Sequence, residues 1–271
     1  MYINEPFEPE IFEQYFQDLR HLEALNQPFC IIGMPDLTNL GKLCSKCLIQ
    51  ELNAKKIVSF YYSDFDPISI VKKQNQIAEL INIEIHIVKR LQNEHDLILI
   101  TSNGIPKSPI GNNYLADKIA EFISSYKTEL IISITGIPIP HPSQAPRNYL
   151  AYTSDKLLQI FKIDKKKYQN TNLRLQPLQK GIITGLNGLI IGYAESLYNV
   201  IGGILLSETD NSKETDYLAI KAILDVLNEI FDLQISYKSL TLKSSQIFKK
   251  EQKTPASKEE ILKKIRKRIQ T

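Results

Sequence analysis

Short apolar runs rich in β-branched residues alternate with segments of helical periodicity, and this alternation limits the possible folds more than any other feature of the chain. Leu40–Leu52 and Tyr114–Tyr126 place apolar residues on one face and predict helices. Alternating strands and helices form right-handed crossovers around a sheet that is covered on both faces. The sequence therefore predicts an α/β fold, a three-layer α/β/α sandwich with a mainly parallel sheet. The runs that predict its first strands are residues 29–33, 56–62, 84–88, 96–101 and 130–135.

The second half of the chain continues the pattern less regularly. Residues 215–231 predict a long amphipathic helix, with Asp210 and Ser212 among the candidate caps. GIITGLNGLIIG, residues 181–192, has no basic residue inside and predicts a strand, a turn and a buried segment rather than a phosphate-binding loop. The step LQNEHD at 91–96 joins two strands directly and predicts an antiparallel pair. Further strands are predicted at 149–152, 173–175 and 203–206, and a short helix at 154–161.

The composition is that of an ordinary globular protein, since 43% of the 271 residues are hydrophobic and 23% are charged. We expect one α/β domain over residues 1–247, with residues 1–27 as an N-terminal arm. The net charge of +3 hides an asymmetry, because residues 248–271 hold nine Lys or Arg and three Glu. These last residues predict a basic linker followed by a C-terminal helix.

The predicted C-terminal helix starts at a capping-box pattern, Ser257 and Glu260, and carries a narrow apolar stripe flanked by basic residues. Such a stripe suits docking onto a partner or a sister subunit, and packing against its own domain is the alternative. We do not expect nucleic-acid binding, because no aromatic residue follows Phe248 to stack on bases. The stripe consists of Leu262, Ile265 and Ile269.

Nothing in the sequence indicates export or a membrane. The stretch MYINEPFEPEIFEQYFQDLR lacks a basic start and an uninterrupted apolar run, so we expect no signal peptide. The most apolar window, residues 188–206, is interrupted by Glu195, Ser196 and Asn199 and predicts buried core. Three cysteines, an odd number, predict reduced thiols rather than a disulfide framework. Together these features predict a cytoplasmic protein.

The stretch GMPDLTNLGKLCSKC at 33–47 follows a predicted strand, where a phosphate loop would lie. A Walker loop is excluded because Thr38 stands where its second glycine is required and Leu43 follows the lysine. A Rossmann turn is excluded because Pro35 removes a main-chain donor. We therefore expect a tight strand-to-helix turn and no cofactor. Anion binding at a helix N-terminus near Asn39 or Leu40 is the alternative.

Cys44 and Cys47 lie three residues apart on the predicted helix, so both thiols can share one face. A redox dithiol needs its pair at the helix start, and this pair lies at least a turn inside. We therefore expect core cysteines and no metal. Zinc would need further ligands from Cys30 or from the scattered His21, His86, His95 and His141.

The remaining polar constellations predict no catalytic set. His141 and Ser143 lie in the proline-rich loop IPIPHPSQAP, but no nucleophile elbow accompanies them. Glu208 and Asp210 at a predicted strand end could form an acid/base pair. Solvated carboxylates that include a helix cap are the expected interpretation of this pair. We therefore predict that the protein is not an enzyme.

Three segments together resemble one family pattern. GMPDLTNLGKL resembles Gly-Trp-Pro-Asp-x-x-x-x-Gly, with Met34 in place of the aromatic residue. KGIITGLNGLIIGYAE resembles a second signature, and ILLSETDNSKETDYLAIKAILDVL resembles a third through Glu208, Asp216 and Ala219. In this order, over residues 28–240, they make the chain similar to the proteasome assembly chaperone family. The matching positions of the first two are Gly33, Pro35, Asp36, Asn39, Gly41, Gly181, Gly185, Asn187, Gly188 and Gly192.

The resemblance is to the branch that holds the second subunit of the eukaryotic assembly heterodimer and its archaeal and bacterial relatives. It implies a fold similar to nucleoside phosphorylases without their catalytic residues, and self-association. Some archaeal relatives bind proteasome α-rings through a C-terminal tripeptide of a hydrophobic residue, tyrosine and any residue. This chain ends Ile269-Gln270-Thr271, which keeps the hydrophobic position but has glutamine in place of tyrosine.

We therefore expect a chaperone-like, homo-oligomeric protein that binds proteasome α-subunits or a similar client. The alternative is a small-molecule enzyme or sensor for a nucleotide or nucleoside. Its pocket would lie at the strand-end loops, because ligands gather at the carboxyl ends of parallel strands. The residues that would line it are Asp36, Asn39, Gly185 and Glu208.

Overall fold

The computed structural model describes residues 9–18, 20, 24–71, 77–90, 95–140, 145–163, 174–210 and 215–235. All of them belong to one compact unit, Met1–Ile235. Residues Ser236–Thr271 form a second unit and lie outside the described part of the chain. The predicted C-terminal helix, with Leu262, Ile265 and Ile269, therefore stays a prediction.

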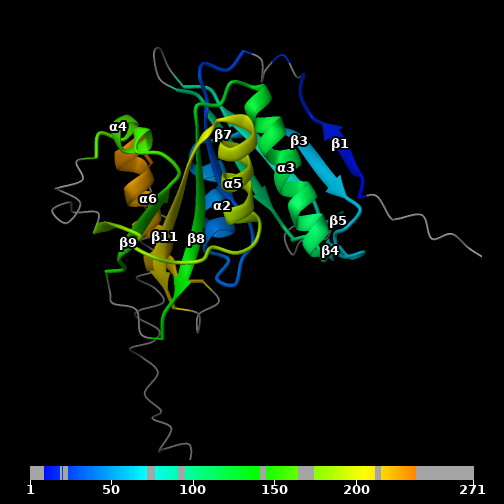
Figure 1. The fold of residues 1–271 in the computed structure, drawn as a ribbon. Helices are drawn as coiled ribbons and strands as arrows, with labels where there is room; N and C mark the ends of the chain where they lie inside the picture. Colours follow the sequence, from blue (N-terminus) through cyan, green and yellow to red (C-terminus); the bar gives the residue numbers. More distant parts are fainter. Residues whose placement is uncertain are drawn as a thin grey trace, which may run out of the picture. The chain divides into compact units, whose positions relative to one another are not determined.

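A mixed sheet of nine strands, in the order β1-β3-β6-β7-β2-β8-β11-β9-β10, runs through this unit (Figure 1). A separate two-stranded hairpin, β4–β5, projects from it. The strands are β1 Ile11–Tyr15, β2 Phe29–Gly33, β3 Lys55–Tyr62, β4 Ser69–Val71, β5 Ala78–Leu80, β6 Ile83–Val88, β7 Leu97–Ser102, β8 Leu130–Pro138, β9 Asn148–Tyr152, β10 Leu175–Pro177 and β11 Ile201–Thr209.

The centre of the sheet is parallel and its flanks are largely antiparallel. Strands β7, β2, β8 and β11 are parallel neighbours. Every residue of β2 is buried, because helices cover both faces of this central strand. Strand β6 pairs with β7 in antiparallel fashion, which confirms the excursion predicted around residues 91–96.

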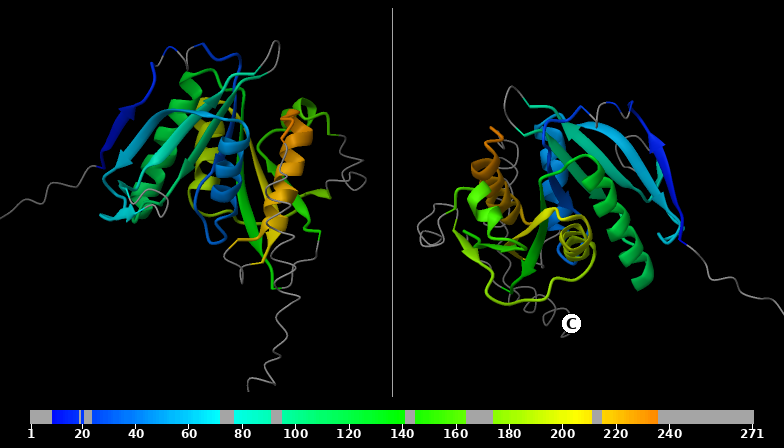
Figure 2. Two further views of the ribbon diagram at one scale, coloured as in Figure 1. Left: turned by 180° about the vertical axis from the view of Figure 1, so that it is seen from behind. Right: turned by 45° about the horizontal axis from the view of Figure 1, so that its top comes forward.

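Helices cover the sheet on both sides, which confirms the predicted sandwich (Figures 1 and 2). Helices α3 and α5 lie side by side over one face, and α2 and α6 lie over the other. The short helix α4 contacts α6 through the edge-to-face pair of Phe161 and Phe231. The helices are α2 Leu40–Glu51, α3 Pro109–Ser125, α4 Lys156–Ile160, α5 Leu186–Tyr198 and α6 Tyr217–Phe231.

Several elements differ from the sequence-based expectations. Helix α5 occupies the segment for which a strand, a turn and a buried stretch were predicted, and it begins after Gly185, whose φ is 76°. Helix α6 is capped by Asp216, which accepts hydrogen bonds from the main-chain N–H groups of Leu218 and Ala219. The predicted cap Asp210 is therefore wrong, and Ser212 lies outside the described residues. Strands β1, β4 and β5 were not predicted.

Candidate functional site at the carboxyl ends of the strands

The three sequence motifs meet at the edge of the sheet where the parallel strands end. The loop after β2 carries the first motif, the start of α5 carries the second, and the end of β11 carries the third. Strands β2, β8 and β11 are consecutive parallel neighbours, so these segments converge although they are far apart in sequence. This convergence defines the candidate site.

Asn187 joins the first two motifs directly. Its side-chain Oδ1 accepts a hydrogen bond from the main-chain N–H of Met34 at 3.0 Å, and its Nδ2 donates to the carbonyl of Met34 at 3.2 Å. The hydroxyl of Ser133 on β8 also donates to Oδ1, at 3.2 Å. Asn187 is 2% exposed, and its amide satisfies two main-chain groups that would otherwise be buried without partners. The side chain therefore holds α5 to the end of β2.

Asp36 closes the loop that follows β2. One carboxylate oxygen accepts hydrogen bonds from the main-chain N–H and the hydroxyl of Thr38, at 2.8 and 2.7 Å. The other accepts a hydrogen bond from the hydroxyl of Thr135 on β8. Thr38 Oγ1 in turn accepts a hydrogen bond from the main-chain N–H of Leu40 in the first turn of α2, at 3.2 Å. The carboxylate of Asp36 and the hydroxyl of Thr38 thus already use the main-chain N–H groups of Thr38 and Leu40, which could otherwise meet an anion.

The glycines of the first motif allow main chains to approach closely. A Cβ atom on Gly33 would lie 2.0 Å from the carbonyl oxygen of Gly41, and one on Gly41 would lie 2.2 Å from that of Ile134. No real Cβ tolerates such distances, and a main-chain oxygen has little freedom to move. Asn39, directly before α2, has a left-handed φ of 53°. The predicted tight strand-to-helix turn is therefore present.

The second motif uses its glycines differently. A Cβ on Gly188 would come within 2.7 Å of the carbonyl oxygen of Ile183. Gly185 has open space around it but a positive φ, which favours glycine. At Gly181 a Cβ would meet Leu178 at an ordinary 3.5 Å, so packing does not require glycine there. Pro35 is half-buried between Met34 and Asp36.

Glu208 at the end of β11 is 4% exposed and forms an ion pair, so the expectation of a solvated carboxylate is wrong for this residue. Arg147 Nε donates to its Oε1 at 2.7 Å, and the hydroxyl of Tyr149 donates to the same oxygen at 3.0 Å. The main-chain N–H of Arg147 donates to Oε2 at 3.2 Å. Asp210, the other member of the predicted pair, donates its main-chain N–H to Oδ2 of Asp216 at 2.9 Å.

The surroundings of Glu208 keep it ionised. Burial alone would raise its pKa, but hydrogen bonds from the side chain and main chain of Arg147 and from Tyr149 outweigh burial and lower it. The pKa of Tyr149 is raised, by burial first and then by its hydrogen bond to Glu208. A general acid at neutral pH needs a raised carboxyl pKa, so Glu208 is not suited to that role.

Two of the three cysteines pack in the interior, and the third is partly exposed. Cys30 and Cys44 are fully buried, and burial raises the pKa of both thiols well above its usual value. Cys47 is half-buried on α2. Within the described ranges, no three His, Cys, Asp or Glu side chains come together as a metal site. His21 and His141 lie outside those ranges.

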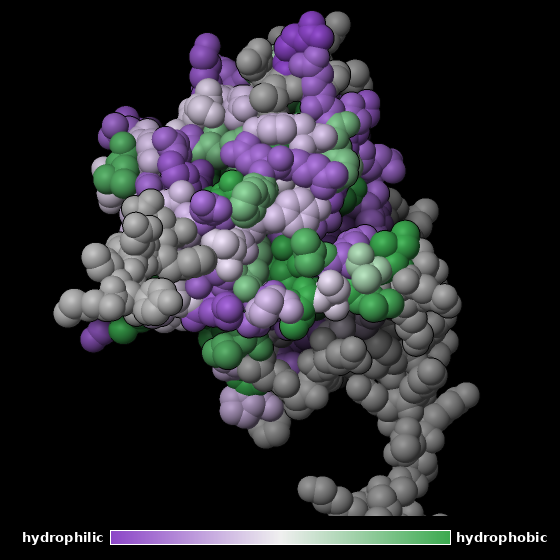
Figure 3. Space-filling model, turned by 90° about the vertical axis from the view of Figure 1, so that its right-hand side faces the viewer, coloured by the Kyte–Doolittle hydropathy of each residue, from purple (hydrophilic) through white to green (hydrophobic). Residues whose placement is uncertain are grey.

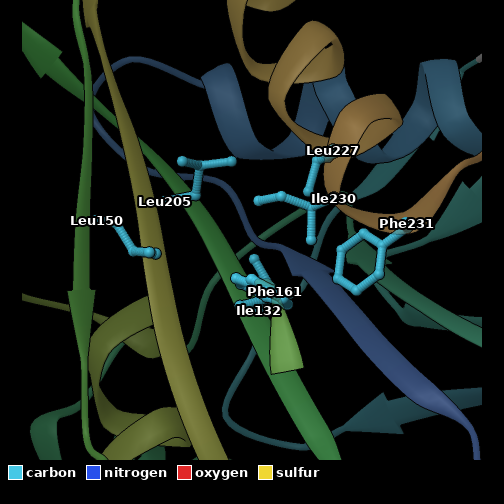
Figure 4. Close-up of a pocket in the computed structure, with 7 residues that line it drawn as sticks. All are labelled: Ile132, Leu150, Phe161, Leu205, Leu227, Ile230 and Phe231. Carbon is cyan, nitrogen blue, oxygen red and sulfur yellow. The ribbon is translucent and has the colours of Figure 1, made fainter. Parts of the chain in front are cut away.

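An apolar gap lies between the sheet and helices α4 and α6 (Figure 4). It measures about 170 Å³ including space open to solvent, and no part of it would hold a water molecule. No polar side chain points into it, so it offers nothing that would orient a ligand. Its lining residues are Ile132, Leu150, Phe161, Leu205, Leu227, Ile230 and Phe231.

Sequence reasoning missed a set of exposed apolar side chains around the candidate site, which we call the apolar rim. Leu37 in the loop after β2 is 90% exposed, and Ile182 before α5 is 91% exposed. Leu37 has a signal in the sequence, as an isolated large aliphatic residue in an otherwise polar loop, whereas Ile182 stands beside Ile183 and has none. The rim consists of Leu37, Ile68, Leu80, Ile105, Ile110 and Ile182.

Part of the rim belongs to the β4–β5 hairpin that follows β3, which contributes Leu80, and part to the segment between β7 and α3, which contributes Ile105. The main-chain N–H of Lys107 donates to the carbonyl of Asp64 at 3.0 Å, and the Asp64 carboxylate accepts hydrogen bonds from Ser108. These bonds tie the root of the hairpin to the start of α3. Figure 3 shows this side of the molecule, where green apolar side chains gather in the lower half of the view. Large exposed apolar patches on soluble proteins mark interaction surfaces.

Among the described helices, none is long and apolar enough to cross a bilayer. The chain matches the sequence model of the PAC2 family over residues 30–254. It is also 24% identical over 245 residues to an uncharacterised protein of Methanocaldococcus jannaschii, and the match covers 90% of each protein.

Solved structures show the same architecture. The chain is similar to PbaB of Pyrococcus furiosus, an archaeal proteasome activator, with 27% identity and a TM-score of 0.76 over 95% of this chain and 99% of that one. It is similar to PbaA of the same organism, an archaeal homologue of proteasome-assembly chaperone, with 19% identity and a TM-score of 0.68 over 91% and 93%. The second likeness concerns the fold alone.

Proposed function

Because the chain belongs to the PAC2 family, we propose that it is a non-enzymatic, proteasome-assembly-chaperone-like protein that self-associates and binds proteasome α-subunits or a similar client. The membership confirms the resemblance that its three motifs indicate. The observation that carries the proposal is the likeness to PbaB, a proteasome activator that the chain matches over almost its whole length. The same likeness favours an archaeal-type partner among proteasome subunits.

The geometry of the candidate site supports protein binding rather than catalysis. Both oxygens of Asp36 and of Glu208 accept hydrogen bonds from neighbouring residues, and the amide of Asn187 is held by Met34 and Ser133. These side chains therefore build the edge of the fold. The alternative of a nucleotide or nucleoside pocket depends on the same side chains and has correspondingly less support.

We place the client contact on the apolar rim. Its side chains are exposed apolar surface at the edge of the sheet where the motifs meet, and burial of apolar surface drives most protein–protein association. Leu262, Ile265 and Ile269 of the predicted C-terminal helix would add a second element for a client or a sister subunit.

A binding experiment with purified α-subunits from the same organism tests the proposal. We expect the wild-type protein to retain α-subunits at low salt. The double substitution L37S/I182S removes two rim anchors and should weaken retention at least about tenfold. L197S is the matched control, because Leu197 is 58% exposed but lies at the other end of α5.

The outcomes separate the parts of the proposal. Failure of the wild-type protein to retain α-subunits would count strongly against the client. Equal loss of binding in L37S/I182S and L197S would remove the rim from the proposal. Removal of residues 249–271 measures the contribution of the tail, and it should leave the thermal melting of the body unchanged.

A further inference from the structure

Strand β1 ends the nine-stranded sheet and pairs on one side only. It runs antiparallel to β3, with Ile11 opposite Tyr62 and Tyr15 opposite Val58. Beyond the ends of this ladder, Glu10 accepts a hydrogen bond from the main-chain N–H of Ser63 at 3.0 Å, and Phe16 donates its N–H to the carbonyl of Ile57 at 2.7 Å.

These bonds fix which main-chain groups of β1 point outward. In an antiparallel pair, hydrogen-bonded and non-hydrogen-bonded positions alternate. Since Glu10 and Phe16 bond toward β3, the main-chain groups of the odd-numbered residues Ile11, Glu13 and Tyr15 face away from it. Within the described part of the chain, no hydrogen bond reaches these outward groups. Strand β1 therefore offers a row of donors and acceptors to another strand.

The sequence of β1 carries little of the usual protection of a sheet edge, since Glu13 is its one charged residue. Natural edges carry lysine, proline or a bulge that discourages pairing. The strand reads IFEQY and pairs with β3 in unbroken register. Aromatic side chains are exposed along it, with Phe12 59% exposed and Tyr15 and the adjoining Phe16 each 44% exposed. An open edge of this kind is a pairing surface.

We propose that β1 pairs in antiparallel fashion with β1 of a second copy of this chain, around a two-fold axis that passes through Gln14. The inference rests on the proposed self-association and assigns its surface. The pairing joins the two sheets edge to edge. In this register Glu13 of each copy lies opposite Tyr15 of the other copy. The main-chain N–H and C=O groups of the two residues form hydrogen bonds with each other.

Charge and polarity select this register. With Gln14 on the axis, Phe12 lies opposite Phe16 of the second copy, and the Glu13 carboxylate lies opposite the Tyr15 hydroxyl. Tyr15 and Glu13 already form a hydrogen bond within one chain, which shows that their polar groups match. An axis through Glu13 would place two carboxylates opposite each other, and an axis through Phe12 would place Glu13 opposite Ile11. Both alternatives are less favourable, because like charges across a ladder repel and an apolar neighbour leaves a carboxylate without a partner.

A single cysteine tests the register. With the axis at Gln14, the two copies of this residue form a non-hydrogen-bonded pair, in which Cα atoms lie about 4.5 Å apart. A disulfide spans Cα atoms about 4.4–6.8 Å apart, so Q14C should cross-link two chains under mild oxidation. E13C is the matched control, because the two copies of residue 13 would be diagonal neighbours about 7–8 Å apart. C47S provides the background, since Cys30 and Cys44 are buried.

We expect Q14C to form a disulfide-linked dimer at least about tenfold faster than E13C, under conditions in which both proteins melt like the wild type. Light scattering should give the wild-type protein a mass of an even number of chains. An oligomeric wild type whose Q14C and E13C variants cross-link equally, or not at all, would overturn the assignment of β1 and leave self-association intact. A monomeric wild type at micromolar concentration would overturn both.

Discussion

The side-chain amide of Asn187 holds both main-chain groups of Met34, with N–O distances of 3.0 and 3.2 Å across 153 positions of sequence. N187A would leave the N–H and C=O of Met34 buried without partners. Each such group costs about 1–3 kcal/mol, so we expect a loss of about 2–6 kcal/mol in the free energy of unfolding. Urea denaturation measures it. N113A, which removes an exposed asparagine that donates to the Pro109 carbonyl and accepts from the Tyr193 hydroxyl, should cost far less because water can replace both bonds. Equal losses in both variants would contradict the role of Asn187.

Alanine substitutions of one glycine in each of the first two motifs should change the stability of the protein in opposite directions. G33A places a methyl group 2.0 Å from a main-chain oxygen of Gly41, so we expect a severe loss of stability or failure to fold. G192A places one in open space inside α5, and should stabilise the protein by about 0.5–1 kcal/mol because alanine favours the helix. Thermal melting of both variants checks the pair. A well-folded G33A would show that α2 does not need this close approach.

The ion pairs of Glu84 on β6 should make the free energy of unfolding depend on pH. Its Oε2 lies 3.4 Å from His86 Nε2, and its Oε1 accepts a hydrogen bond from Lys56 Nζ at 2.9 Å. The hydrogen bond with His86 lowers its pKa most; burial opposes this and Lys56 adds to it, so the pKa falls from 4.5 to about 2. Because the folded pKa lies below the unfolded one, Glu84 stabilises the fold above pH 4.5, and this contribution is lost as the pH falls toward about 2.

The substitution E84Q tests this pH dependence. After allowance for partial solvent exposure, we expect it to lower the free energy of unfolding by about 1–2 kcal/mol at neutral pH. The difference from the wild type should shrink progressively on acidification. E121Q removes an exposed pair with Lys118 and should cost under about 0.5 kcal/mol at any pH. A pH-independent effect of E84Q would contradict the origin of its stabilisation.

Nucleotides and nucleosides should not stabilise the protein. A ligand at 100 times its dissociation constant adds about 2.7 kcal/mol to the folded state, which a thermal-shift screen detects easily. We expect no shift, because the side chains of Asp36 and Glu208 already bond to their neighbours. A reproducible shift that D36A abolishes would favour the small-molecule alternative over the proposed adhesion.

Thiol labelling should distinguish the cysteines. Cys30 and Cys44 are buried with raised pKa values, and Cys47 is half-buried. A thiol reagent at mildly alkaline pH should therefore modify Cys47 first, and the other two only when the protein unfolds. Mass spectrometry of labelled peptides gives the order. Rapid labelling of Cys44 in the folded protein would contradict its place in the core.

Elements with a strong local signal could be predicted from the sequence. Strand β2 was predicted at its observed bounds, because a strand buried on both faces reads as an uninterrupted apolar run. Helix α5 was missed because glycines dominate its start and lower its helical propensity. Contacts with α3 and the bonds of Asn187 to Met34 supply its stability instead. Strand β1 was missed because one-sided pairing leaves most of its residues exposed.

In the candidate site, too, local features could be predicted from the sequence, whereas contacts between distant residues could not. The glycines at positions 33 and 41 were predicted to matter, but only the folded turn shows that they face each other. Glu208 was expected in solvent because its partner Arg147 lies 61 residues earlier in the chain. Such a pairing depends on the neighbouring positions of β9 and β11, which no local pattern in the sequence records.

The strand order has a consequence for synthesis on the ribosome. Strand β2 is made early but lies at the centre, between β7 and β8. Its apolar residues therefore have no partner on one side until residue 97 has been translated, and none on the other until residue 130. A nascent chain shorter than this exposes the middle of its own future core, and exposed apolar strands of this kind are prone to aggregate until their partners have been made.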